Sequence, residues 1–290
     1  MSDSCVHFSK PNGENEQNVG DNLHTDEYFI VYLDLLGTKD RISDNEDESL
    51  RTINTLYSEA LTYKKGILRN VYGTESYAKI FSDNIVVAVK VTEEHAVRQN
   101  ALFFLSYFTS YFQTRALLDY QWLVRGSMTC GNLYICDKNI YGPDDSVVKS
   151  NLIWGSALIN AYRMEDTIAV YPRVIIDEKI LHLGYSDSNG SDPNPYPHMF
   201  LKDEDGLYFL DYLNTYVTSR YYESKMIFEK AEKSIEGLKQ NVTQSNNPQF
   251  ENKSVIQKIM WTESYLKRAL SSPVLQEIDY NPDPLYGDKK

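Results

Sequence analysis

One carboxylate interrupts an otherwise apolar run near the start of the chain. Residues Tyr28–Leu36 read YFIVYLDLL, so β-branched and aromatic side chains surround Asp34. A run of this kind is typical of a buried central strand. Burying a carboxylate there costs several kcal/mol unless it is paired, hydrogen-bonded or bound to a metal. Asp34 therefore needs a partner, and the sequence leaves open a turn cap, an ion pair with Lys39 or Arg41, and a metal ion.

A second acid lies at the tip of a predicted β-hairpin. Two short apolar segments, Tyr77–Phe81 and Ile85–Lys90, flank a Ser-Asp-Asn turn that contains Asp83. Taken alone, Asp83 can be an ordinary turn residue. If the first strand lies beside this hairpin, Asp34 and Asp83 converge at one edge of the sheet, and Gly37 opens space for a phosphate. Two carboxylates and a backbone carbonyl would suit Mg²⁺ or Mn²⁺, with substrate phosphates completing the coordination.

The rest of the chain predicts alternating strands and helices. In chain order we expect a polar loop after Gly37, a helix over 50–61, a helix over 97–112 with Thr92 as N-cap, a hairpin over 122–136 that pivots at Gly131, a helix over Ser156–Glu165, a strand over Tyr171–Ile176, a hairpin over Met199–Tyr212, and helices over 216–272 with a break at 241–247. This order predicts an α+β fold, a mostly antiparallel sheet with helices on one face. We divide the chain into a flexible segment (1–26), a folded domain (27–214) and a helical extension with a tail (215–290).

Composition narrows the class of partner and the location. The 290 residues include 29 Lys and Arg against 41 Asp and Glu, a formal net charge of −12. Such a chain repels phosphate backbones and anionic membranes, so we expect neither nucleic acid nor membrane as a partner. No apolar run has transmembrane length, and the N-terminus lacks the pattern of a signal peptide. Three cysteines are too few for a disulfide scaffold, and neither His nor Cys shows zinc-ligand spacing. We expect a soluble, cytoplasmic protein.

Four segments together carry a resemblance to a known family. They are YLDLLG at Tyr32–Gly37, KIFSD at Lys79–Asp83, VRGSMTCG at Val124–Gly131 and IWGSALINAYRME at Ile153–Glu165. In this order they resemble the class III nucleotidyl cyclases, the family of adenylate and guanylate cyclases, over about residues 28–214. With SDN at the hairpin and DGLYFLDY near the end of that span, the chain looks most like the bacterial pyrimidine cyclases of Pycsar anti-phage systems. The resemblance implies a ferredoxin-like, palm-type catalytic domain over 27–214.

The resemblance also implies roles for individual residues. Asp34 and Asp83, with the Leu35 carbonyl, would hold two divalent cations, Mn²⁺ or Mg²⁺. Arg163 would neutralise charge on the α-phosphate, a task for which the guanidinium fork is suited; taken alone it could pair with Glu165 or Asp166. A further set is matched more loosely. Gly37 would border the phosphates, Lys202 would bind the triphosphate or be a solvated lysine, and Arg125 matches its motif but could be structural.

Two departures from the family pattern and one lysine concern which nucleotide the site would bind. Adenylate members carry an acid where this chain has Leu152, so an acceptor for the adenine amino group is missing. The ribose-orienting Asn of the family is replaced by Ile159, and Asn160 is rotated by about 100° around the helix, which leaves open how the ribose is held. Lys79 occupies the base-reading position, unless it is a surface residue. An ammonium only donates hydrogen bonds, and uracil offers two carbonyls where cytosine offers one.

The sequence thus favours a homodimeric cyclase that converts UTP to 3′,5′-cyclic UMP and pyrophosphate. In the family, the metal-binding acids and the arginine come from opposite protomers, so Asp34 and Asp83 of one chain would face Arg163 of the other. The product would be a second messenger in anti-phage defence, read by a separate cyclic-nucleotide-binding effector. The alternatives are a cytidylate cyclase acting on CTP, less favourably a purine cyclase, and a degenerate scaffold that binds nucleotide without turnover.

Overall fold

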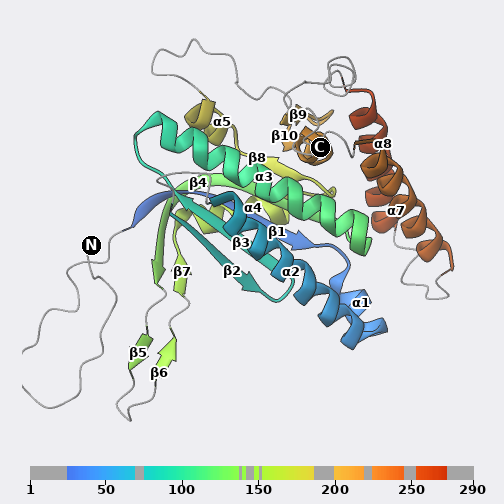
Figure 1. The fold of residues 1–290 in the computed structure, drawn as a ribbon, viewed down its shortest axis with the longest axis horizontal. Coiled ribbons are helices and arrows are strands. Elements are labelled where there is room, and N and C mark those ends of the chain that lie inside the picture. Colours follow the sequence, from blue (N-terminus) through green and yellow to red (C-terminus); the bar gives the residue numbers. More distant parts are fainter. Residues whose placement is uncertain are drawn as a thin grey trace, which may run out of the picture.

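The fold is built on one long, mostly antiparallel sheet (Figure 1). The computed structural model describes residues 25–68, 75–136, 139–141, 147–149, 152–185, 199–218, 224–244 and 253–272. Seven strands follow the order β2-β3-β1-β4-β8-β10-β9, and β7 pairs with β4 to complete eight. Each neighbouring pair is antiparallel except β4 with β8. The predicted α+β class is therefore confirmed, with β1 inside the sheet between β3 and β4.

The strands of this sheet and of a separate two-stranded ribbon are short except for β1 and β4. Their bounds are β1 Asp26–Leu35, β2 Ser76–Phe81, β3 Asn84–Lys90, β4 Val124–Cys136, β7 Leu152–Trp154, β8 Val174–Ile176, β9 Phe200–Lys202 and β10 Tyr208–Leu210, with the ribbon formed by β5 Asn139–Tyr141 and β6 Val147–Lys149. The predicted hairpins β2–β3 and β9–β10 are confirmed.

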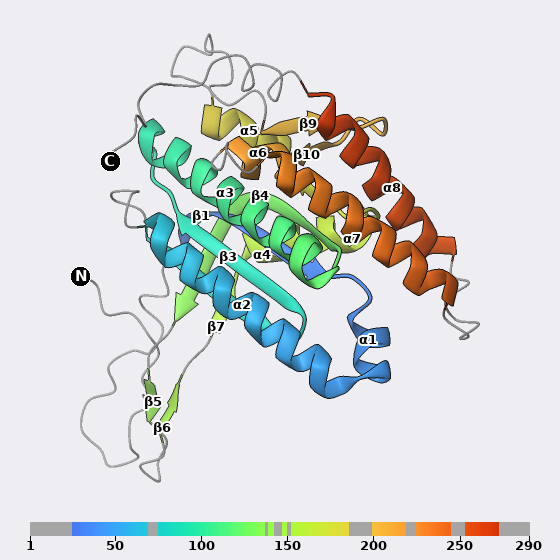
Figure 2. The ribbon, with the colours of Figure 1, turned by 45° about the vertical axis from the view of Figure 1, so that its right-hand side comes forward.

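Helices cover both faces of the sheet, so the expectation of helices on one face is wrong. Their bounds are α1 Thr38–Asp44, α2 Glu46–Leu68, α3 His95–Tyr120, α4 Ser156–Thr167, α5 Glu178–Tyr185, α6 Tyr212–Thr218, α7 Ser224–Gln244 and α8 Lys253–Leu270. In Figures 1 and 2 the helices α2 and α3 lie over one face, with α7 and α8 beside them. None of the helices in the described part of the chain has the length and hydrophobicity that crossing a membrane requires.

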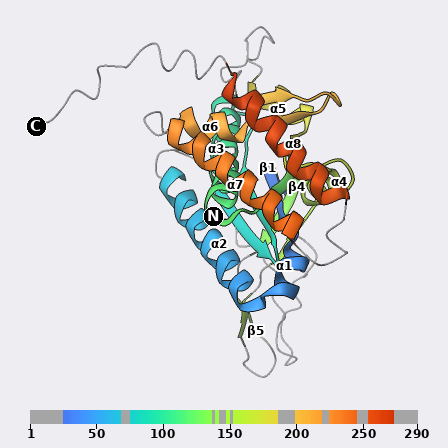
Figure 3. The same cartoon turned by 90° about the vertical axis from the view of Figure 1, so that its right-hand side faces the viewer.

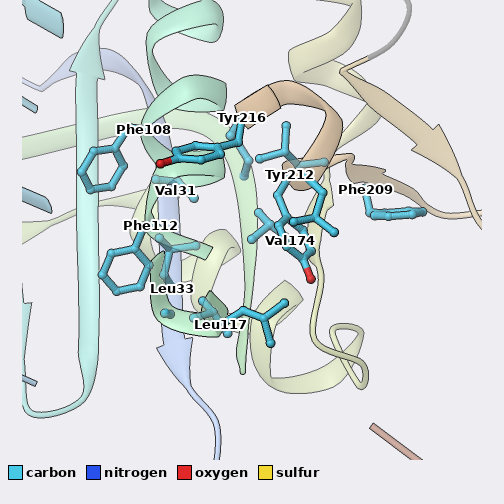
Figure 4. Close-up of a cluster of buried hydrophobic side chains, with 14 of the residues drawn as sticks. Val31, Leu33, Phe108, Phe112, Leu117, Val174, Phe209, Tyr212 and Tyr216 are labelled. Atoms are coloured by element: carbon cyan, nitrogen blue, oxygen red, sulfur yellow. The ribbon is translucent and has the colours of Figure 1, made fainter. Parts of the chain in front are cut away.

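Strand β1 is buried on both faces because its side chains alternate between two apolar clusters. The larger cluster joins Val31 and Leu33 of β1 to the helices α3 and α6, and Figure 4 shows them beside Phe108, Phe112 and Tyr216. The opposite face packs on α4; that cluster contains Tyr28, Ile30, Ala157 and Ala161. The small alanines let α4 approach the sheet closely. Asp34 follows Tyr32 by two positions, so it faces α4 as well.

Three local predictions are wrong. The expected loop after Gly37 contains the short helix α1. The helix α3 begins at His95, so its N-cap is Glu94, and the hydroxyl of Thr92 accepts a hydrogen bond from the Glu94 amide instead. Gly131 is no hairpin pivot, because β4 runs through it without a turn. A Cβ at Gly131 would lie 2.9 Å from the hydroxyl oxygen of Ser156, so glycine is required there by the close approach of α4.

The C-terminal helices are tied to the sheet by buried charge and hydrogen bonds. Arg173, only 1% exposed, pairs with Asp203 and Asp205 of the β9–β10 turn, and Asp203 also pairs with Arg268 of α8. The Tyr265 hydroxyl donates to Asp211 at 2.6 Å. The predicted break between two helices falls between α7 and α8, and the loop at 186–197 and the tail after 272 lie outside the described residues. Figure 3 shows α7 and α8 as one antiparallel layer on this side of the molecule.

Candidate active site

The sheet brings Asp34 and Asp83 to the same end of two neighbouring strands. Asp34 is opposite Asn84 in the antiparallel pairing of β1 with β3. The Leu35 amide donates a hydrogen bond of 3.2 Å to the Asp83 carbonyl, which fixes the turn beside the end of β1. The first strand thus lies beside the hairpin, as the sequence analysis required for the two carboxylates to converge.

Asp34 is held by Arg125 of the neighbouring strand β4. The Arg125 Nε lies 3.0 Å from Asp34 Oδ2 and 2.6 Å from Glu165 Oε1 of α4. The pKa of Asp34 is raised by burial; the Arg125 guanidinium opposes this, and the Asp83 carboxylate adds to it. Arg41 does not pair with Asp34, because its guanidinium donates to the carbonyls of Tyr120 and Gln121. Asp34 thus has a cationic partner that the sequence did not single out.

Glu165 belongs to this site, although the sequence analysis considered it only as a partner of Arg163. The side chain points from α4 to the sheet and is buried, 3% exposed. Burial raises the pKa of Glu165 to about 7, the nearby Asp34 carboxylate also raises it, and Arg125 lowers it. The periodicity of α4 could have indicated this position, since Glu165 follows the buried Ala157 and Ala161 at intervals of four.

Replacing Glu165 with Gln should change how stability depends on pH. The folded pKa of about 7 exceeds the ordinary value of 4.5, so between these values the folded state binds more protons and stability falls as pH rises. Gln does not ionise. We therefore expect the free energy of unfolding of Glu165→Gln, relative to the unsubstituted protein, to rise by about 2 kcal/mol between about pH 5 and about pH 8. Urea unfolding at several pH values measures this, with the exposed Glu93→Gln as control. If the difference in free energy of unfolding between Glu165→Gln and the unsubstituted protein did not change with pH, the raised pKa of Glu165 would be wrong.

Lys79 is buried on the face of the sheet that carries Asp34. It is 5% exposed and is opposite Val86 of β3, which in turn is opposite Tyr32 of β1. The alternative that Lys79 is a surface residue is therefore wrong. Of the two aromatic residues on its strand, Tyr77 packs edge-to-face on Tyr28, whereas Phe81 is 41% exposed.

The carboxylate and carbonyl oxygens where β1 ends beside the β2–β3 turn suit a hard divalent cation. The Asp83 carboxylate lies near enough to disfavour ionisation of Asp34, a repulsion that a cation would relieve. The Leu35 carbonyl accepts a hydrogen bond from the Thr38 hydroxyl at 2.7 Å and keeps its second lone pair. No cluster of three or more Asp, Glu, His or Cys side chains with metal-binding geometry occurs in the described ranges. A divalent cation held by two carboxylates would also need substrate or water oxygens.

Gly37 leaves open space beside these oxygens. Its φ of +78° is favourable for glycine, and a Cβ built there would have no atom within 4 Å. Gly37 is exposed and directly precedes α1, and its place beside a phosphate stays a prediction.

Arg163, Leu152 and Lys202 lie away from the two acids within one chain. Arg163 is exposed on α4, on the side of the helix opposite the buried Ala161 and Glu165, and no ion pair joins it to another residue in the described part of the chain. Leu152 is 48% exposed on β7. Lys202 lies on β9 at the far edge of the sheet, with its amine 5.0 Å from the centre of the Tyr208 ring.

Comparisons with known proteins give structural similarity only. No family model matches the sequence, and no curated protein matches it. The solved structure of the adenylyl cyclase CyaB from P. aeruginosa is similar over 64% of this chain and 94% of that protein, with 16% identity and a TM-score of 0.41. A bacterial light-regulated adenylyl cyclase is similar over 74% of this chain and 60% of that protein, with 14% identity and the same TM-score.

Proposed function

We propose that this protein is a nucleotidyl cyclase that converts UTP to 3′,5′-cyclic UMP and pyrophosphate. The observation that carries the proposal is the convergence of Asp34 and Asp83 at one end of β1 and the β2–β3 turn. The buried Lys79 on the same face supports a bound base beside them. By the sequence resemblance, the product would be a second messenger for anti-phage defence, read by a separate effector.

The reaction joins the ribose 3′-oxygen to the α-phosphorus, breaks the bond between that phosphorus and the oxygen of the β-phosphate, and releases the 3′-hydroxyl proton to solvent. Two bound Mn²⁺ or Mg²⁺ ions would lower the pKa of the 3′-hydroxyl and neutralise the departing pyrophosphate. The chain's own part is to hold the ligand oxygens in place. Arg125 orients Asp34 through a 3.0 Å contact, and the Leu35 amide anchors the Asp83 turn.

Lys79 supports a pyrimidine base with acceptor oxygens. Lys79 is 5% exposed, an ammonium only donates hydrogen bonds, and uracil offers acceptors at both O2 and O4. Cytosine presents an amino donor at one of these places, which a lysine cannot satisfy. The preference for UTP over CTP rests on this difference.

The exposed apolar side chains around Arg163 support a homodimer. Four large residues of β7 and α4 are between 45% and 55% exposed: Leu152, Trp154, Ile159 and Tyr162. Large apolar side chains that are this exposed are of the kind that protein contacts cover. A two-fold dimer through this face would present Arg163 of one protomer to the acids of its partner, in two equivalent sites.

Parallel incubations with ATP, GTP, CTP and UTP in the presence of Mn²⁺ test the proposal. We expect cyclic UMP to form from UTP at least about tenfold faster than cyclic products form from the other nucleotides, because one good hydrogen bond contributes about that factor. The Asp34→Ala variant should form no product. Chromatography with mass detection identifies the product. Product from CTP instead would keep the reaction and overturn the interpretation of Lys79. The absence of product from all four would contradict the enzyme assignment.

A further inference from the structure

A cavity separates the core of the domain from the C-terminal helices. It has a volume of about 680 Å³, and its walls come from α1, the end of α3, α7 and α8. Leu36 and Gly37 line it on one side, and Val255 and Lys258 of α8 line it on the other. Figures 2 and 3 show α1, α7 and α8 on the same side of the molecule, where β1 ends. The cavity is large enough for several phosphate groups.

The cavity lies beside the end of β1, and its lining begins directly after Asp34 and Leu35 without including Asp83 or Arg125. Leu36 and Gly37 directly follow Asp34 and Leu35 in the chain, so the cavity begins where the proposed metal ligands end. The pKa of Lys258 is lowered by burial and by the Arg125 guanidinium, and the Asp34 carboxylate opposes this. Lys258 therefore lies within electrostatic range of the site, although it comes from a helix more than 200 positions further along the chain.

The charge of Lys258 is not used within the fold. No ion pair joins Lys258 to a carboxylate among the residues the structure describes, and the side chain is half-buried. Other charged residues of the wall are engaged: Arg41 bonds to main-chain carbonyls, and Asp119 pairs with Arg115 and Lys230. The remaining acids of the wall are exposed to water: Asp40, Asp44 and Glu48. A half-buried ammonium without a counter-ion favours an anionic ligand.

We propose that Lys258 binds the terminal phosphates of the nucleoside triphosphate and the pyrophosphate that is released. A triphosphate whose α-phosphate lies at Asp34 and Asp83 can extend over Gly37, where the space is open, into the cavity beside Lys258. This inference rests on the proposed function. It makes α8, which lies outside the residues that resemble a cyclase, part of the substrate site. Lys202, the lysine suggested by the sequence, is at the opposite edge of the sheet.

Binding measurements with Lys258→Gln test the inference apart from turnover. The probes are a non-hydrolysable UTP analogue, pyrophosphate and UMP, each titrated calorimetrically in the presence of Mg²⁺. We expect the variant to bind the analogue and pyrophosphate about tenfold more weakly, the loss of one charge-assisted hydrogen bond, and UMP within about twofold. Lys258→Arg should retain most of the affinity. Lys267→Gln removes the same charge from an exposed position of α8, where Lys267 pairs with Glu263, and should bind all three probes normally.

The result that overturns the inference is unchanged affinity of Lys258→Gln for the analogue and for pyrophosphate. An equal loss of affinity for UMP would also overturn it, since Lys258 would then act on the whole site. If Lys258→Gln fails to fold, Lys258→Met, which keeps the length of the side chain, replaces it in the same titrations. Failure of the proposed function is distinguishable, because the unsubstituted protein would then form no cyclic nucleotide from any triphosphate, whereas failure of this inference leaves product formation intact.

Discussion

Replacing Asp83 with Asn should lower kcat by at least about a thousandfold and leave the fold intact, because the loss of one ligand carboxylate removes the two-metal site. Asn has the shape of Asp but not its charge, so the geometry of the turn is preserved while divalent cations lose a ligand. Cyclic nucleotide formation at saturating Mn²⁺ measures the rate. Titration of Mn²⁺, followed by its electron paramagnetic resonance signal, should show weaker binding in the same variant.

Asp83 gives a cleaner test than Asp34. Asp83 is only partly buried in a turn, and its Oδ1 accepts a single weak hydrogen bond of 3.3 Å from Asn84. We therefore expect a stability change within about 0.5 kcal/mol, as for most surface substitutions. Asp34 is paired with the half-buried Arg125, so its removal would also disturb that residue. If Asp83→Asn kept full activity and full Mn²⁺ affinity, the metal assignment would be wrong.

Sequence periodicity was enough to place the two acids. The apolar run around Asp34 predicted a buried strand, and the polar turn around Asp83 predicted a hairpin, because alternation and turn residues are local signals. Their convergence depended on the strand order, which no local signal determines. The pairing of β1 with β3 supplied it.

The partners of the acids could not be predicted in the same way. Arg125 and Glu165 meet Asp34 only because β4 and α4 pack on β1, and they lie 91 and 131 positions beyond Asp34 in the chain. Gly131 was misinterpreted for a related reason: its constraint is the approach of α4, not a turn in its own strand. Lys258 gave no signal at all, since an isolated lysine on an amphipathic helix is ordinary.

Mixing two inactive variants should restore activity if the site is shared between protomers. Asp83→Asn removes a metal ligand, and Arg163→Ala removes the cation expected to stabilise the transition state, at a cost of about a hundredfold to a thousandfold. In a mixed dimer, one site carries both defects and the other carries neither. Random exchange at equal concentrations makes half of the dimers mixed, so we expect about a quarter of the unsubstituted activity.

The exposed position of Arg163 is what makes this result informative. Its side of α4 faces away from the acids of its own chain, so a site contained in one chain would gain nothing from mixing. The matched control mixes Asp83→Asn with Arg268→Ala, which removes an arginine that pairs with Asp203 on the far side of the sheet. Half of the chains in that mixture carry intact Asp83 and Arg163, so it should keep about half of the unsubstituted activity with or without exchange, and it checks that the Asp83→Asn chain does not inhibit its partner. If native mass spectrometry shows mixed dimers of Asp83→Asn and Arg163→Ala and the mixture stays inactive while the control mixture is active, Arg163 does not act across a dimer interface.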